Sequence, residues 1–490
     1  MRSRTWPACS WPPASSPNEL GRARIAGKGI LMTLSQLSTI ARFVATAPER
    51  ALAADVIETA KQCLVDWTAV SLAARHDAGP MATRRLIEQW HTHGQACNLY
   101  GDTGAAAPMA LVNASLSHSL DYDDMHFATT FHPSGPTWAT ALAIGMDRGA
   151  TEEQMLRAFV TGYEVGATMG CGDVGPRLAD AGWHPTGILG HFSATSAAAV
   201  LLRLPASQIA VALGLAATQA AGLQASGGTM AKPYHVGKSA MNGVLAAELA
   251  ALGMDANTRL FDEAEAGFLS VLFQRPAAAS FDSLGRTWQI RGNTFKPYAS
   301  CQLTHAAHEV ARGLAGRLER CMLRQVRVWV HPLAIKVAGR PGASTPMEGK
   351  FSIAYCVSLG LLGHDADMTG FLPERIADPD VRKLAAMTRV IPDDDTERCA
   401  ARIELDHGAA GVVRGEINAV RGSPGRPMTW NELEEKFLSL TRPILGDSAA
   451  QLLLVLRNFE RPGQLAEFVR IVRMTRDNAI AGTTATETQR

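Results

Sequence analysis

The period of the hydrophobic pattern changes once along this chain of 490 residues. From Leu34 to about Phe273 apolar residues recur at helical spacing, and residues 51–72 are a clear example. Beyond that point four segments alternate apolar and polar side chains as strands do, namely 287–291, 325–330, 402–405 and 412–420. The sequence therefore predicts a mainly α fold, with a large all-helical domain and a smaller α/β domain.

The end of the chain returns to the helical pattern. Thr429 and Glu432 have the spacing of a capping box and follow a segment rich in Pro and Gly. We therefore expect a helical domain built from both ends of the chain, residues 32–274 and 425–465, with the α/β domain at 275–424 between them. Residues 466–490 are expected to form a C-terminal tail.

The first 31 residues do not share the helical pattern. They carry five basic side chains against one acidic side chain and show no apolar periodicity. They also lack the apolar stretch of a signal peptide. We expect a dispensable extension, either a disordered tail or a stretch upstream of a true start at Met32, and an organelle transit peptide is the alternative.

Charge and composition exclude several classes of protein. The chain has 47 basic and 46 acidic residues, so it offers no electrostatic footprint for nucleic acid or for an anionic membrane. Residues 204–231 contain no charged side chain, but Ser, Thr, Gln and Gly recur there, which favours a helix buried on all sides over a membrane span. The eight cysteines are scattered without a metal-binding or disulfide spacing, which is typical of a cytoplasmic protein with reduced thiols.

Four short segments gather His, Asp, Lys and Gly within the otherwise helical pattern: 117–133, 182–192, 226–238 and 295–305. Two of them contain a His-Pro pair, at His132 and His184, where proline suits the first position of a helix. Each imidazole would then lie beside the positive end of a helix, which favours its neutral, proton-accepting form. The alternative is that each histidine only caps its own helix.

Two lysines precede prolines in the same kind of loop, Lys232 and Lys296. A lysine fixed in this way can direct its ammonium group at a carboxylate, although two exposed loop lysines would give the same pattern. Asp121, Asp123, Asp124, His126 and His132 could instead be metal ligands. Their spacing matches no specific metal signature, so we assign no metal.

Together these groups suit the abstraction of a proton next to a carboxylate, with lysines stabilising the enolate-like charge that develops. Dehydration, decarboxylation and racemisation of a di- or tricarboxylic acid all share that step. The sequence has no nucleotide-binding fingerprint and no nucleophile elbow, so no such motif competes with this interpretation.

The chain resembles the MmgE/PrpD family in these four segments. The resemblance rests on the 121–124 loop with His132-Pro133, on residues 182–185, on residues 232–237, and on residues 295–298 leading to His305. It implies a helical domain with a smaller α/β lid domain, a homodimer, and no metal or organic cofactor. Family members include 2-methylcitrate dehydratase, cis-aconitate decarboxylase and iminodisuccinate epimerase.

The resemblance also implies residue roles. The active-site pattern of the family's decarboxylase falls on Asp121, His132, His184, Lys232 and Lys296. Two hydroxyl-bearing positions of that pattern are apolar here, Met125 and, by a less direct alignment, Val337.

We therefore expect His132, His184, Asp121 and Lys232 to be catalytic. The expected substrate-binding residues are Lys296, His235, Arg340 and Asp124. The expected activity is that of a cofactor-independent lyase of the 2-methylcitrate dehydratase type. An epimerase or decarboxylase using the same site, or an inactive family member, is the alternative. The expected partners are a small carboxylic acid and a second copy of the chain, with no nucleic acid and no membrane.

Overall fold

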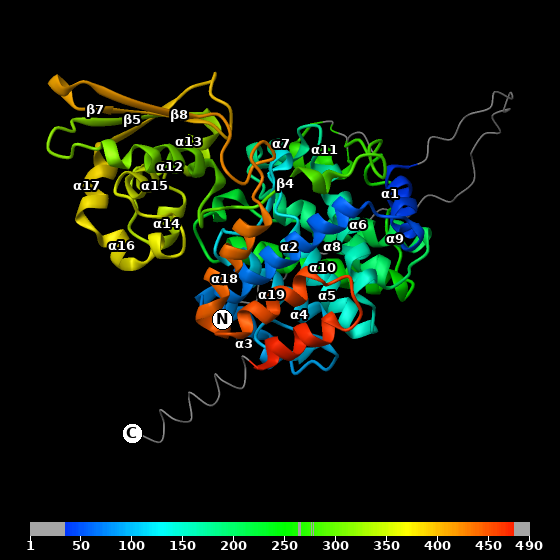
Figure 1. The fold of residues 1–490 in the computed structure, drawn as a ribbon. Helices are drawn as coiled ribbons and strands as arrows, with labels where there is room; N and C mark the ends of the chain where they lie inside the picture. Colours follow the sequence, from blue (N-terminus) through cyan, green and yellow to red (C-terminus); the bar gives the residue numbers. More distant parts are fainter. Residues whose placement is uncertain (1–34, 263–265, 276, 278, 475–490) are drawn as a thin grey trace, which may run out of the picture. The chain divides into compact units, whose positions relative to one another are not determined.

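The helical part of the chain is organised around two helices that are buried on every side. The computed structural model describes residues 35–262, 266–275, 277 and 279–474 (Figure 1). All residues of α4 (Ala106–Ser119) are buried, and in α8 (Pro185–Leu201) only the last residue is partly exposed. Both helices pack against α10 (Ala231–Ala251). Helices that are buried around their whole circumference occur in the interior of a large helical domain.

Glycines allow α10 to approach its neighbours closely. A Cβ atom at Gly237 would lie 2.1 Å from Ser115 Oγ on α4, and one at Gly243 would lie 2.4 Å from Ala194 Cβ on α8. Such separations are far below van der Waals contact, so only glycine permits this packing. Three further helices complete the layer around them: α2 (Ala54–Ala73), α5 (Ser134–Arg148) and α6 (Glu152–Gly170).

The sequence predicted one buried helix over the uncharged stretch 204–231. The structure shows that this prediction is wrong. Helix α9 (Ala206–Gln219) occupies the first half of this stretch and is buried on one face only. Residues 220–230 form a loop that contains the short turn η3 (Gln224–Ser226), and Gly228 in this loop has a φ of 83°, which ordinary side chains rarely adopt. No helix among the described residues is long and apolar enough to cross a membrane.

The α/β domain contains a four-stranded sheet in the order β6-β5-β7-β8. Strand β5 (Gln325–Val330) pairs in parallel with β6 (Thr388–Pro392) and antiparallel with β7 (Ala401–Asp406), which pairs antiparallel with β8 (Val412–Ile417). Figure 1 shows α12 (Gln302–Leu314), α15 (Ile353–Leu361) and α17 (Pro379–Met387) on one face of this sheet. Alternate residues of β5 and β7 are buried beneath these helices, as the sequence pattern predicted.

One predicted strand is wrong, and one strand of the four-stranded sheet was missed. Residues 287–291 do not join a sheet, and the short helix η4 (Gln289–Gly292) occupies most of this segment. The Glu164 carboxylate accepts hydrogen bonds from the backbone N–H groups of Gln289 and Ile290, which replaces strand pairing there. Strand β6 lies at the sheet edge and is never fully buried, so its sequence lacks the usual alternation.

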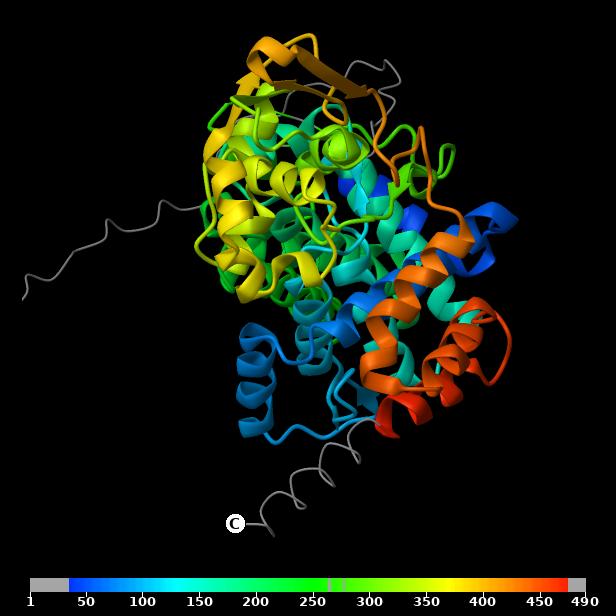
Figure 2. The ribbon, with the colours of Figure 1, turned by 60° about the vertical axis from the view of Figure 1, so that its left-hand side comes forward.

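The C-terminal helices lie against the first half of the chain, as Figure 2 shows. Helix α18 (Trp430–Leu445) begins with the predicted capping box of Thr429 and Glu432 and packs against α2. Helix α19 (Ser448–Arg457) follows it. Residues 464–474, most of which the sequence placed in a tail, are helical and bury Phe468 and Ile471 in the main hydrophobic core. The predicted extension 1–31 lies outside the described residues.

Candidate active site

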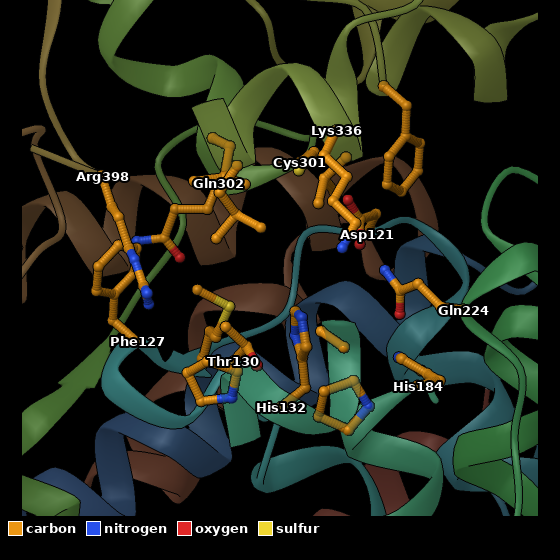
Figure 3. A pocket seen from close by; sticks show the side chains of 18 of the residues that line it. Asp121, Phe127, Thr130, His132, His184, Gln224, Cys301, Gln302, Lys336 and Arg398 are labelled. Atoms are coloured by element: carbon orange, nitrogen blue, oxygen red, sulfur yellow. The ribbon is translucent and has the colours of Figure 1, made fainter. Parts of the chain in front are cut away.

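A cavity of about 510 Å³ lies where loops of the helical domain meet the α/β domain (Figure 3). The helical domain contributes to it Asp121, His132, His184 and Lys232, and the remainder of the polar lining comes from Lys296, Gln302, Lys336, Arg398 and a few others. All four segments that the sequence singled out therefore meet at one place, the third of them through Lys232 alone. The sequence pattern alone could not show this convergence.

A buried cluster of lysines surrounds Asp121 at this cavity. Asp121 follows the end of α4 and has a φ of 53°, a left-handed conformation that is uncommon for residues other than glycine. Lys232 Nζ lies 2.5 Å from Asp121 Oδ1. Lys296 Nζ lies 3.4 Å from the same oxygen and donates a hydrogen bond of 2.9 Å to the Asp121 backbone carbonyl. Burial alone would raise the pKa of Asp121, but the ammonium groups of Lys232 and Lys296 outweigh that effect. The pKa of Asp121 therefore lies well below its usual value, and this carboxyl is ionised.

A third lysine, Lys350, joins this cluster from the α/β domain. It is buried and donates a hydrogen bond of 2.5 Å to the Leu120 carbonyl, one residue before Asp121. Burial lowers the pKa of Lys350 to about 8. Three lysine side chains thus lie around a single carboxylate, and the excess of positive charge favours an anionic ligand.

The cluster is held in place by the C-terminal return of the chain. Lys436 of α18 is buried, and its ammonium group donates to Asp66 Oδ1 at 2.6 Å, to the Tyr122 carbonyl at 2.8 Å and to the Lys296 carbonyl at 2.9 Å. These three bonds fix the 121–124 loop, the 295–298 loop and helix α2 to one another. Lys436 is therefore a positioning residue that the sequence did not reveal.

Beside the lysine cluster lies an array of two histidines on one aspartate. Asp123 Oδ2 is 2.7 Å from His118 Nδ1 and 3.2 Å from His132 Nδ1. Burial raises the pKa of Asp123, but the two imidazoles lower it well below its usual value, so Asp123 is a carboxylate. With Nδ1 of His132 directed at Asp123, Nε2 is the nitrogen left for a substrate.

His184 lies next to this array as a neutral imidazole. Its ring stacks on His118 with 5.5 Å between ring centroids, and its Nδ1 lies 3.3 Å from Nδ1 of His235. Burial, together with the neighbouring histidines and Lys232, lowers the pKa of His184 well below its usual value. His184 is the N-cap residue of α8 with Pro185 directly after it, as predicted, but its side chain makes no capping hydrogen bond. The interpretation of His184 as a simple helix cap is therefore wrong.

Two family models match this chain. Residues 38–280 match the model of the MmgE/PrpD N-terminal domain, and residues 298–460 match that of the MmgE/PrpD C-terminal domain. The chain belongs to the MmgE/PrpD family.

Curated members of the MmgE/PrpD family are similar to this chain over most of its length. The cis-aconitate decarboxylase-like protein of Aspergillus oryzae is 25% identical over 431 residues, which cover 81% of this chain and 89% of the relative. The human cis-aconitate decarboxylase is 26% identical over 373 residues, or 72% and 76% of the two chains. The Aspergillus terreus enzyme of the same name is 24% identical over 429 residues, or 80% and 86%.

This MmgE/PrpD protein brings five of the eight predicted site residues to the cavity wall: Asp121, His132, His184, Lys232 and Lys296. The other three lie elsewhere. His235 is not part of the cavity lining, and its Nδ1 lies 3.3 Å from Nδ1 of His184. Asp124 is buried away from the cavity, accepts a hydrogen bond of 2.7 Å from Ser134, and has a pKa raised well above its usual value by burial. Arg340 lines a neighbouring hollow and lies 3.8 Å from Glu348.

Several residues of the site were missed in the sequence. His118 lies within the 117–133 segment, so the local clustering of polar side chains could have found it. Asp123 of the same segment was considered only as a metal ligand. Gln302 lies within the 295–305 segment, so the same clustering pointed to its loop. Lys350 and Arg398 come from the α/β domain and carry no local signal. Only the tertiary structure brings these two near the cavity.

His118, Asp123 and His132 could also hold a metal ion, because their candidate ligand atoms all lie within 4.8 Å of one another. The shortest of these separations, 2.7 Å between His118 Nδ1 and Asp123 Oδ2, is that of a hydrogen bond. These atoms are therefore already partners of each other, and the array is suited to holding and moving a proton.

Proposed function

We propose that this MmgE/PrpD protein is a cofactor-independent lyase that acts on a di- or tricarboxylic acid. The reaction would begin with abstraction of a proton next to a carboxylate, as in a dehydratase of the 2-methylcitrate type. The observation that carries this proposal is the meeting of the Asp121 lysine cluster and the His132 imidazole at one cavity.

His132 is the proposed base. Asp123 faces its Nδ1 at 3.2 Å and would stabilise the imidazolium that forms when Nε2 takes a proton. His184 is the weaker candidate, because its lowered pKa opposes the gain of a proton. We therefore assign proton transfer to His132. His184 would remain neutral and donate a hydrogen bond to the substrate. From the sequence, both histidines were expected to be catalytic, with no division of roles between them.

The lysine cluster would stabilise the other half of the reaction. A substrate carboxylate next to Lys232 and Lys296 gains negative charge as the neighbouring C–H bond breaks, and fixed ammonium groups stabilise that charge. In a dehydration the electron pair then forms the C=C bond, the C–O bond breaks, and the proton held on His132 leaves with the hydroxyl as water.

Decarboxylation is the second candidate, because the similar curated proteins are named cis-aconitate decarboxylases. The two positions at which this chain departs from the decarboxylase pattern, Met125 and Val337, both line the cavity. An apolar side chain at each of these positions removes a hydroxyl from the space where the substrate would bind. We therefore favour dehydration over decarboxylation of cis-aconitate.

The test is an assay with three readouts on the purified chain. Incubation with 2-methylcitrate should produce the ultraviolet absorbance of an enoate, and a His132→Gln variant should not. Release of carbon dioxide from cis-aconitate would support the decarboxylase instead. Exchange of a substrate proton for solvent deuterium, with neither product formed, would indicate an epimerase. The absence of all three signals with any polycarboxylate would contradict the proposal.

We also propose that the protein is a cytoplasmic homodimer. No disulfide joins any two of the described cysteines, in keeping with a reducing compartment. Helix α10 exposes Tyr234, Leu245 and the neighbouring Leu252 on one face, where they are 44%, 36% and 85% exposed. Light scattering should give twice the chain mass, and Leu245→Glu should lower it; a monomer mass for the unaltered chain would contradict this proposal.

A further inference from the structure

The wall of the cavity opposite the lysine cluster carries a cation that the reaction described above does not use. Arg398 lies in the loop between β6 and β7 and lines the cavity. Its guanidinium makes no hydrogen bond or ion pair with any residue that the structure describes, and Figure 3 shows it directed into the cavity. A guanidinium offers a planar fork of donors that matches a carboxylate.

Gln302 lies beside Arg398 and is also without a partner. It is 6% exposed, and its buried Oε1 has no hydrogen-bond partner among the described residues. Rotation of the amide exchanges its N and O, so the side chain can donate to a carboxylate or accept from a hydroxyl. A buried amide left unpaired is costly, and a polar ligand in the cavity would satisfy it.

Gln302 is also the first residue of α12, a helix of 13 residues. Cys301, Gln302 and Leu303 all line the cavity, so the N-terminal end of this helix faces it. The positive end of the helix dipole therefore adds to the charge of Arg398, and both favour an anion at this wall.

The two cationic regions lie on opposite sides of the base. Figure 3 places Arg398, Gln302 and Phe127 on one side of the cavity and Asp121, Gln224 and His184 on the other, with His132 between them. We propose that Arg398 and Gln302 form a second carboxylate subsite, so that the substrate spans the cavity with one carboxylate at each end. The carbon that loses its proton then lies over His132. This inference rests on the proposed function and adds the specificity for a second carboxylate.

The acidic side chains near this wall do not neutralise the subsite. Asp180 lines the cavity, but Lys336 pairs with it at 2.8 Å. The acidic residues next to Arg398 in its loop, Asp394, Asp395 and Glu397, line a neighbouring hollow that Arg398 also borders, but none of them lines this cavity or forms an ion pair with Arg398 in the described structure. Arg398 therefore remains free to bind an anion.

The test is calorimetric binding of two unreactive probes, tricarballylate with three carboxylates and butyrate with one. The unaltered chain should bind tricarballylate more tightly than butyrate. Arg398→Gln should weaken tricarballylate binding by about 10- to 100-fold, the effect expected for a charge-assisted hydrogen bond, and leave butyrate binding unchanged. Gln302→Leu should weaken tricarballylate binding by about 3- to 10-fold, as for a neutral hydrogen bond.

The matched control is Arg414→Gln, also in the α/β domain. Arg414 lies on β8, its side chain is 67% exposed, and it pairs with Glu404 at 2.7 Å away from the cavity lining. This variant should bind both probes like the unaltered chain.

The outcomes separate the subsite from the proposed reaction. Unchanged tricarballylate binding in Arg398→Gln, or an equal loss for both probes, would overturn the subsite and leave the lyase activity standing. Equal affinity of the unaltered chain for the two probes would also overturn it. The expected binding pattern in a protein that converts no polycarboxylate would keep the subsite and contradict the proposed function.

Discussion

The two walls of the cavity differ in how their charged side chains are held. On the helical wall, Asp121 and Asp123 are buried and are fixed by lysines and histidines at hydrogen-bonding distance. On the α/β wall, Arg398 makes no such contact with the described residues, and Lys336 pairs with Asp180 through side chains that are 57% and 61% exposed. The helical wall therefore keeps its geometry without a ligand, while the α/β wall can adjust to one. This difference suits chemistry on the first wall and selection of the substrate on the second.

The strongest test of this comparison is His132→Gln on the helical wall. Loss of a placed general base should lower turnover by about 10²- to 10⁴-fold. The melting temperature should change little, because the imidazole borders a cavity and packs no core. Steady-state kinetics and thermal unfolding of the same preparation check both expectations. A variant that unfolds while its soluble fraction keeps full specific activity would show that His132 is structural.

The next test concerns the support of the helical wall, through Lys436→Met. The substitution leaves Asp66 and two backbone carbonyls without their buried partner, and loss of one member of a buried ion pair costs about 3–5 kcal/mol. The free energy of unfolding in urea should fall by this amount, and activity should fall with it.

Lys61→Met is the matched control for Lys436→Met. Lys61 is also a buried lysine, but its partners Glu58 and Glu460 have side chains that are 45% and 37% exposed, so water can replace it. An equal loss of stability in the two variants would contradict the special role given to Lys436.

A smaller effect is expected from pH, through Lys350. Its pKa of about 8 means that the lysine cluster loses a positive charge as pH rises through that value. The KM for a polycarboxylate should therefore increase above pH 8. In Lys350→Met the KM should already be raised at pH 7, and its rise through pH 8 should be absent. A KM profile that is unchanged by the substitution would contradict the role of Lys350.

The same group acts on folding stability with the opposite sign. The pKa of Lys350 is lower in the folded chain than its unperturbed value of 10.5. Between these two values the unfolded chain binds the proton and the folded chain does not, so this group's contribution to stability rises with pH in that window. As pH rises through this window, binding of the polycarboxylate should weaken while the contribution of Lys350 to folding stability increases. Weaker binding at high pH would therefore reflect a change at the site and not unfolding of the chain.

The smallest expected effect is that of chelation. Incubation with EDTA should leave turnover unchanged, since His118, Asp123 and His132 are assigned to proton transfer. Loss of turnover that zinc or magnesium restores would instead assign these three residues to a metal and would end the distinction drawn between the two walls.

Local sequence patterns predicted much of the fold because they report contacts between near neighbours. The capping boxes at Thr151 and Thr429 mark the starts of α6 and α18, although only the second was predicted as a capping box. The alternation at 325–330 gives strand β5 with its buried face. Residues 287–291 show the limit, because they alternate like a strand but have no strand partner, and Glu164 binds their backbone instead.

By itself the sequence determined which residue types could carry the chemistry, since a His-Pro or Lys-Pro pair constrains its own loop wherever that loop lies. Only the tertiary structure decided which of these groups meet. Asp123 and Asp124 are adjacent in sequence, yet one faces two imidazoles and is ionised, while burial raises the pKa of the other. Lys350 and Arg398 reach the cavity region from a separate domain. The physical reason is that charge, burial and pKa depend on neighbours in space, and long-range packing sets those neighbours.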